Sequence, residues 1–270
     1  MRVCRVNLTH SVPFVLYENL FTSHRGKKFT IIGVSNMATY YGDSGNNYIG
    51  PYSGPNIIFG GAGNDTLEGF TDHDRLDGED GNDVLLGWFG NDSLYGGNGS
   101  DTLYGEDNND LLSGGEGNDY LLGGNNNDTL YGNAGNDVLW GDDNDLHSGS
   151  DVLAGGTGDD TLFGGGESDF YIFTFYSDGR DYIYDSSDSY DELYINGVSN
   201  LSGLQFFRAT AFGSSNDYND LVIRRAGDTA MSEYIVVDDY WSGSAAGAGR
   251  IEYLTVNGSN YWFNDVTSSL

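Results

Sequence analysis

Hydrophobic and acidic residues between residues 60 and 172 recur with a period of nine. A leucine stands two residues after an aspartate in eleven consecutive units, and Tyr171 takes the leucine place in the twelfth. The aspartates are Asp65, Asp74, Asp83, Asp92, Asp101, Asp110, Asp119, Asp128, Asp137, Asp151, Asp160 and Asp169, with one five-residue insertion at 144–148. A repeat of fixed length predicts a solenoid, in which stacked units bury a shared core.

Each unit predicts one short strand. Side chains alternate between the two faces of a strand, so the leucine points inward and its two neighbours point outward. We expect a six-residue turn followed by a three-residue strand, and two units then make one coil of eighteen residues. The sequence therefore predicts an all-β fold, a parallel β-roll (two-sheet β-solenoid) with a leucine interior over residues 42–172.

This alternation divides the aspartates between two edges of the roll. One edge receives Asp65, Asp83, Asp101, Asp119, Asp137 and Asp160, and the other receives Asp74, Asp92, Asp110, Asp128, Asp151 and Asp169. Carboxylates eighteen residues apart would stack about 4.8 Å from one another, the spacing of neighbouring strands. Like charges at that spacing repel, so the roll needs a counter-ion to close.

Charge and composition narrow the function classes. The chain has 11 Lys and Arg against 41 Asp and Glu, and residues 60–172 hold 25 acids against the single base Arg75. Such a block repels nucleic acid and anionic membranes and attracts divalent cations. No apolar run reaches the length of a membrane span, and Cys4 is the only cysteine, which excludes an intrachain disulfide.

The unit Gly60-Gly61-Ala62-Gly63-Asn64-Asp65-Thr66-Leu67-Glu68 resembles the RTX, or haemolysin-type, nonapeptide G-G-x-G-x-D-x-U-x. The resemblance implies that Ca²⁺ lies between successive turns on each edge, held by the sixth-place aspartates and by carbonyls of the second and fourth places. Those places belong to Gly61, Gly63, Gly81, Gly97, Gly99, Gly115, Gly117, Gly135, Gly156 and Gly158. Carboxylate and carbonyl oxygens suit Ca²⁺, and six aspartates per edge give at most about ten ions.

The ends of the array depart from the repeat. Asn47 and Asn56 take the aspartate place in the first two turns, which we expect to bind calcium weakly or not at all. Residues 1–41 form an N-terminal extension or cap, and a second interpretation places the natural start at Met37. In the last full turn Glu167 stands where glycine or asparagine is usual, which makes that turn the poorest match.

Residues 173–270 lose the period and predict a β-rich C-terminal cap, similar to the region found beside such repeats in haemolysin-type proteins. Asp181 and Asp191 are candidates to complete a last calcium site. The resemblance implies an uncleaved secretion signal near the C-terminus, with which residues 266–270 are compatible. It also implies type I secretion machinery as a partner and a secreted, extracellular or cell-surface location.

Two functions remain open. The first is a non-catalytic structural, matrix or surface-associated exoprotein that folds on binding several Ca²⁺ ions. The alternative is a detached RTX secretion or folding module of an exoenzyme or toxin. The chain contains neither H-E-x-x-H nor G-x-S-x-G, so we expect no enzyme activity.

Outward strand positions on one predicted sheet carry an apolar stripe. Its members are Val84, Leu86, Tyr104, Tyr120, Leu122, Val138, Trp140 and Phe163. A long apolar surface indicates a covered or binding face, with the C-terminal segment, a second copy in a homo-oligomer or an extracellular partner as occupant. The competing interpretation is that aromatic and branched residues simply suit strands.

Overall fold

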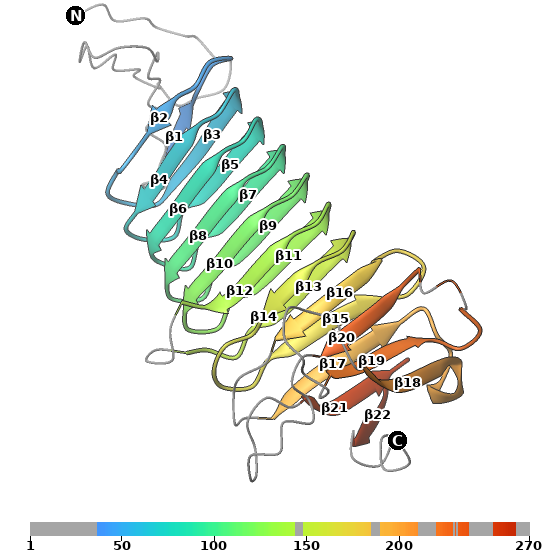
Figure 1. Cartoon of the computed structure of the whole chain (residues 1–270). Helices are drawn as coiled ribbons and strands as arrows, with labels where there is room; N and C mark the ends of the chain where they lie inside the picture. Colours follow the sequence, from blue (N-terminus) through green and yellow to red (C-terminus); the bar gives the residue numbers. More distant parts are fainter. Residues whose placement is uncertain are drawn as a thin grey trace, which may run out of the picture.

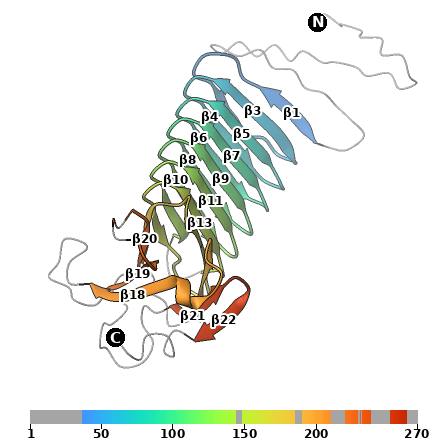
Figure 2. The same cartoon turned by 90° about the vertical axis from the view of Figure 1, so that its right-hand side faces the viewer.

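The chain forms an elongated roll of two sheets. The structure is a computed structural model that describes residues 37–143, 148–184, 190–209, 220–228, 230, 232–237 and 251–262. Each sheet has eleven strands, and Figure 1 shows the strands stacked along one axis, with the same stack seen from the side in Figure 2. The predictions for residues 1–36 and 266–270 lie outside the described residues, as does most of the insertion.

One sheet, called sheet A, contains one strand of every coil. In spatial order it comprises β1 (Ala38–Tyr41), β3 (Asn56–Ala62), β5 (Arg75–Asp80), β7 (Ser93–Asn98), β9 (Leu111–Glu116), β11 (Thr129–Ala134), β13 (Val152–Thr157), β15 (Phe170–Thr174), β17 (Asp191–Asn196), β21 (Ile251–Val256) and β22 (Ser259–Trp262). All neighbours are parallel except β21 and β22, which form an antiparallel pair.

The other sheet, sheet B, contains the alternate strands. It comprises β2 (Tyr48–Ile49), β4 (Thr66–Phe70), β6 (Val84–Phe89), β8 (Thr102–Asp107), β10 (Tyr120–Asn125), β12 (Val138–Asp142), β14 (Thr161–Phe163), β16 (Arg180–Tyr184), β20 (Tyr234–Val237), β19 (Asp220–Arg225) and β18 (Leu204–Ala209). A 3₁₀ turn at Leu201–Gly203 precedes β18, and the described residues contain no α-helix.

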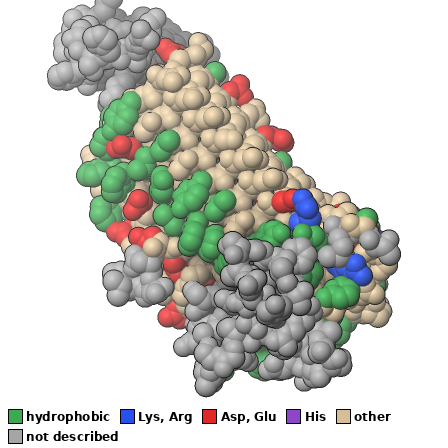
Figure 3. All heavy atoms as spheres, viewed as in Figure 1, with side chains coloured by type: hydrophobic (Ala, Val, Ile, Leu, Met, Phe, Trp, Pro, Cys, Tyr) green, Lys and Arg blue, Asp and Glu red, His purple; other side chains and the backbone are tan. Residues whose placement is uncertain are grey.

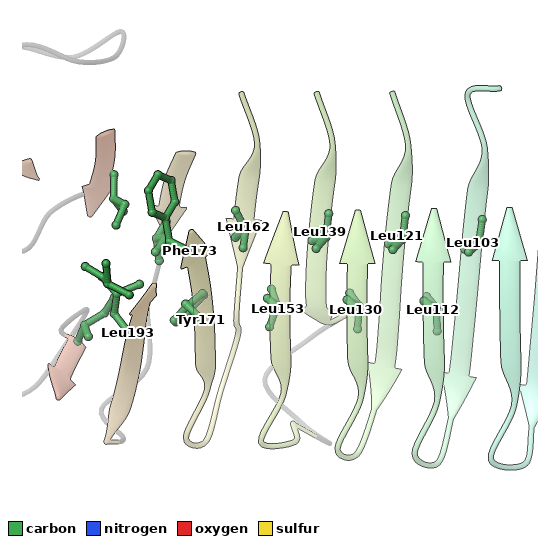
Figure 4. Packing of buried hydrophobic residues seen from close by; sticks show 14 of the residues in the cluster. Leu103, Leu112, Leu121, Leu130, Leu139, Leu153, Leu162, Tyr171, Phe173 and Leu193 are labelled. Carbon is green, nitrogen blue, oxygen red and sulfur yellow. The ribbon is translucent and has the colours of Figure 1, made fainter. Parts of the chain in front are cut away.

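The register confirms the predicted coil of eighteen residues. In sheet B, Leu103 pairs with Leu121 and Leu121 with Leu139, and in sheet A Leu112 pairs with Leu130. The repeat leucines are 0–1% exposed. Figure 4 shows that they enter the space between the sheets from both sides. Burying each leucine stabilises the fold by roughly 1.5–3 kcal/mol, so each unit of the roll adds a similar amount of hydrophobic stabilisation.

The parallel ladder extends beyond residues 42–172 at both ends. At the start, β1 pairs with β3 over Ala38–Tyr41. After residue 172, β17 and β21 continue sheet A while β16 and β20 continue sheet B. One hydrophobic cluster runs without a break from Ile49 to Val256, so the C-terminal strands share the core of the repeats.

Strand length differs from the expected three residues. Most repeat strands have six, because the ladder of backbone hydrogen bonds continues through the first three places of the next unit. Those places include backbone with positive φ, such as Gly97 (111°) and Glu106 (78°). Because the stacked turns have the same shape, their backbones form hydrogen bonds with one another as strands do. A loop of about three residues is then left between successive strands.

The predicted apolar stripe lies on the outside of sheet B, along β6, β8, β10, β12 and β14. Figure 3 shows hydrophobic side chains gathered along this side of the roll. Trp140 stacks on Phe163 at a ring separation of 3.7 Å, and Phe163 stacks on Tyr184 at 4.8 Å. Tyr104 and Tyr120 lie 6.2 Å apart on neighbouring strands. Cross-strand contacts between aromatic side chains contribute to the stability of a sheet even where no partner covers that face.

Candidate metal centre

The predicted aspartates form two hydrogen-bonded ladders, one on each edge of the roll. Along the first edge, each backbone N–H donates to the Oδ1 atom of the aspartate one coil further on. Asp65 donates to Asp83 at 2.7 Å, Asp83 to Asp101 at 2.7 Å and Asp101 to Asp119 at 2.8 Å. The same bond continues from Asp119 to Asp137 and from Asp137 to Asp160. These six side chains therefore lie in one row.

The second edge repeats the arrangement. Its donors and acceptors run Asp74 to Asp92, Asp92 to Asp110, Asp110 to Asp128, Asp128 to Asp151 and Asp151 to Asp169, at 2.7–2.9 Å. The bond from Asp128 to Asp151 crosses the five-residue insertion at 2.7 Å, the ordinary distance. The insertion thus enlarges a turn without breaking the ladder.

Each ladder extends one step past the repeats. Asp160 donates to Asp181 Oδ1 at 3.2 Å and Asp169 donates to Asp191 Oδ1 at 2.8 Å. Asp181 and Asp191 are 2% and 0% exposed. Each edge therefore carries seven stacked aspartates and six intervals between them, one more of each than the repeats alone provide.

The second carboxylate oxygen of the repeat aspartates is what the fold leaves unsatisfied. Oδ2 is buried and meets no hydrogen-bond donor in Asp65, Asp74, Asp83, Asp92, Asp101, Asp110, Asp119, Asp128, Asp137, Asp151 and Asp160. A buried polar atom without a partner costs about 1–3 kcal/mol, and more when it is charged. Eleven such atoms in two straight rows require protons or cations.

Backbone carbonyl oxygens lie beside these atoms. A Cβ placed on Gly105, the first residue of its unit, would lie 2.5 Å from Asp110 Oδ2 and 2.5 Å from the Gly123 carbonyl oxygen. A Cβ on Gly60 would meet Asp65 Oδ2 at 2.6 Å and the Gly78 carbonyl at 2.7 Å. Glycine in the first place therefore leaves room for carboxylate and carbonyl oxygens to approach one another, and such a donor set suits Ca²⁺.

Burial raises the pKa of the ladder carboxyls. Loss of hydration is the main cause, and it raises the pKa of Asp101, Asp119 and Asp137 to about 6, although the backbone hydrogen bond of each opposes the change. On the second edge burial, with a further contribution from the charge of neighbouring acidic residues, raises the pKa to about 8 for Asp110 and about 9 for Asp128. The metal-free fold therefore disfavours ionised carboxylates.

The second- and fourth-place glycines of the predicted site occupy the turns of the first edge. All ten have φ between 103° and 147°, the region that favours glycine. On the second edge other residue types adopt positive φ at these places. They include Asp72, Asn108 and Asn126, together with Glu167, whose turn keeps its ladder bond. The structure thus gives both edges the same positive-φ turn, with glycine predominant on the first edge and mixed with other residue types on the second.

Two features of the site escaped the sequence prediction. One is the row of first-place carbonyls, although a glycine in that place of every unit from Gly60 onwards was its visible signal. The other is Asp142, which is 5% exposed and accepts from the N–H groups of Gly149 and Gly166 at 3.0 and 2.8 Å. Its carboxylate closes the turn that the insertion enlarges.

Side chains alone do not complete a metal shell. Across the ranges that the structure describes, no group of three or more His, Cys, Asp or Glu side chains converges on one point. Backbone carbonyls would have to supply the remaining ligands. His73, which stands between Asp72 and Asp74, belongs to no such group. Its Nδ1 atom accepts a hydrogen bond from the Asn91 N–H at 2.7 Å.

Comparison with known families decides the identity of the repeats. The family described as RTX calcium-binding nonapeptide repeat (4 copies) matches residues 52–85, 87–121, 122–145 and 147–173. Residues 52–173 are RTX calcium-binding nonapeptide repeats. The match covers the two aspartate ladders up to Asp169, so the RTX repeats and the buried carboxylates are the same part of the molecule.

Other comparisons are more distant. Among solved structures, this chain is similar to the crystal structure of extracellular lipase LipA from Serratia marcescens, with 22% sequence identity and a TM-score of 0.31. The similarity covers 69% of this chain and 38% of the lipase chain, so this chain spans well under half of that protein. A comparison with curated proteins found no match.

Proposed function

We propose that this protein is a secreted calcium-binding repeat protein that folds on binding several Ca²⁺ ions and serves as a structural, matrix or surface-associated exoprotein. The observation that carries the proposal is the pair of ladders in which eleven buried carboxylate oxygens lack a donor. The RTX repeats imply calcium as the ion. The aspartates of the two edges would hold it together with carbonyls of the glycine-rich turns, and the bound ions would neutralise the ladders.

Electrostatics indicates how strongly folding depends on the ion. Two ionised carboxylates about 4.8 Å apart repel by roughly 3 kcal/mol at an effective dielectric constant near 20. A whole domain is stable by only about 5–15 kcal/mol. A few pairs of neighbouring ionised carboxylates without a bound cation are therefore enough to prevent the roll from folding. The free energy of ion binding then becomes free energy of folding.

Calcium fits the site better than magnesium. Ca²⁺ accepts six to eight oxygen ligands in flexible geometry, whereas Mg²⁺ demands a near-ideal octahedron and gives up its waters reluctantly. The turns offer carboxylates and carbonyls fixed by a continuous backbone ladder. An ion that tolerates irregular geometry suits them better.

The test is a metal titration of the whole chain at pH 8, followed by far-UV circular dichroism. After EDTA treatment we expect the β-sheet signal to be lost, and millimolar Ca²⁺ to restore it, while Mg²⁺ at equal ionic strength does not. Matched magnesium controls for screening of the acidic residues. A metal-free protein that keeps its full β-sheet signal at pH 8 would refute the proposal.

Location and partners complete the proposal. Export by type I secretion machinery would deliver an unfolded chain into a calcium-rich exterior, where it folds. Among the described residues, no helix is long and apolar enough to cross a membrane. The sheet B stripe would contact a second copy or an extracellular partner, and we assign the chain no catalytic activity.

A further inference from the structure

The first coil solves the problem of the buried oxygens in a different way from the RTX repeats. Asn47 and Asn56 stand in the aspartate place and are 8% and 1% exposed. Their backbone N–H groups donate to Asp65 Oδ1 and Asp74 Oδ1, both at 2.6 Å. Both residues are therefore the first members of the two ladders, in register with the aspartates that follow.

The side-chain amides of these residues donate to carbonyl oxygens of their own turns and to the Oδ1 atoms of the next aspartates in the ladders. Asn56 Nδ2 donates to the fourth-place Gly54 carbonyl, to Asp74 Oδ1 at 2.9 Å and to the second-place Tyr52 carbonyl at 3.3 Å. Asn47 Nδ2 donates to the fourth-place Gly45 carbonyl and to Asp65 Oδ1 at 3.1 Å.

The amide nitrogen occupies the position that Oδ2 has in the aspartate turns. A Cβ on Gly42, the first residue of its turn, would lie 3.0 Å from Asn47 Nδ2, as a Cβ on Gly60 would lie 2.6 Å from Asp65 Oδ2. Aspartate brings an acceptor to a place already surrounded by carbonyl acceptors, which calls for a cation. Asparagine brings two N–H donors to the same place, and these satisfy the acceptors directly.

We propose that Asn47 and Asn56 set the N-terminal limit of calcium binding, because their amide groups take the place of the ion in the first coil. This coil then closes without metal and presents a hydrogen-bonded template, uncharged at its two ladder positions, on which the calcium-dependent coils stack. The inference rests on the proposed function, since it concerns where calcium binding stops.

The test counts the ions bound to the whole chain at saturating Ca²⁺ by native mass spectrometry. Asn47→Asp and Asn56→Asp should each add one ion, and the double variant should add two. Asn46→Asp is the matched control, because its exposed side chain adds the same charge to the same turn outside the ladder. We expect it to add none.

The outcomes separate this inference from the proposed function. A wild-type chain that binds no Ca²⁺ refutes both. A wild-type chain that binds Ca²⁺, with Asn47→Asp and Asn56→Asp variants that fold and gain no ion, refutes the inference alone.

A reciprocal substitution inside the array gives a second readout that does not depend on new sites. Asp101→Asn should bind fewer ions than wild type and still unfold at a higher temperature than Asp101→Ala in limiting Ca²⁺. The reason is that the introduced amide can donate to the fourth-place carbonyl of its own turn, Gly99. Equal unfolding temperatures for the two variants would overturn the inference.

Discussion

Lowering the pH of the metal-free protein tests whether carboxylate charge is what keeps the roll open. In EDTA at pH 8 the ladder aspartates are ionised in the unfolded chain, whereas the folded chain disfavours their ionised form. Burial raises the folded-state pKa of Asp101, Asp119 and Asp137 to about 6, from an ordinary value of 3.8. A raised pKa means that the folded state binds more protons than the unfolded state between those two pH values. Its contribution to stability is therefore complete below about pH 4 and is lost as the pH rises through 6.

The size of the effect follows from linkage. Each carboxyl that is protonated in the fold and ionised in the unfolded chain adds about 1.4 kcal/mol per pH unit. A group with a pKa of about 6 is only half protonated at pH 6, so three such groups add about 3 kcal/mol between pH 6 and pH 5. That gain is a large fraction of the roughly 5–15 kcal/mol by which a whole domain is stable, so protons should replace part of the calcium requirement.

The assay is far-UV circular dichroism in EDTA from pH 8 to pH 5, which stays above the sequence pI of about 4.1. We expect the β-sheet signal to grow as the pH falls and to disappear again on return to pH 8. The calcium-loaded protein is the control and should change little over the same range. A metal-free chain that stays unfolded at pH 5 would refute the assignment of instability to the ladders.

Three further tests, each by substitution, concern other parts of the molecule. Leu121→Ala should lower the free energy of unfolding of the calcium-loaded protein by about 2–5 kcal/mol, measured by denaturant titration. The control is Leu111→Ala, on the outer face, which should lower the free energy of unfolding by a smaller amount. Gly114→Ala should raise the calcium concentration needed for folding, because the new methyl would lie 2.8 Å from Asp119 Cγ; an unchanged midpoint would contradict the site. Tyr104→Ser combined with Trp140→Ser should change the oligomeric state or the stability, measured by light scattering and thermal unfolding, and no change in either would argue against a contact role for sheet B.

The regular part of the fold was predictable because one period governs both backbone and side chains. The spacing of Leu103, Leu112 and Leu121 fixes which strands share a sheet, and the structure confirms it. The same spacing placed the aspartates on two edges. Neither conclusion required knowledge of the tertiary contacts, since each coil contacts chiefly copies of itself.

The remaining features depend on contacts that the period does not describe. Asp181 and Asp191 were candidates for a last site, but they lie 21 and 22 residues after their predecessors, so the period alone could not place them in the ladders. Asp142 gains its role from the insertion beside it. Asn56 was recognisable as a departure from aspartate, but only its hydrogen bonds show that it satisfies the oxygens of its turn.

The two sheets end in different ways, with a β21–β22 pair on sheet A and a β18–β19–β20 meander on sheet B. Adding or deleting eighteen residues would leave each terminal structure on its own sheet. Adding or deleting nine would deliver each to the wrong sheet and exchange the edges of every aspartate beyond that point. The array can therefore change length only by an even number of nonapeptides, and this parity rule is imposed by the C-terminal strands, not by the repeats themselves.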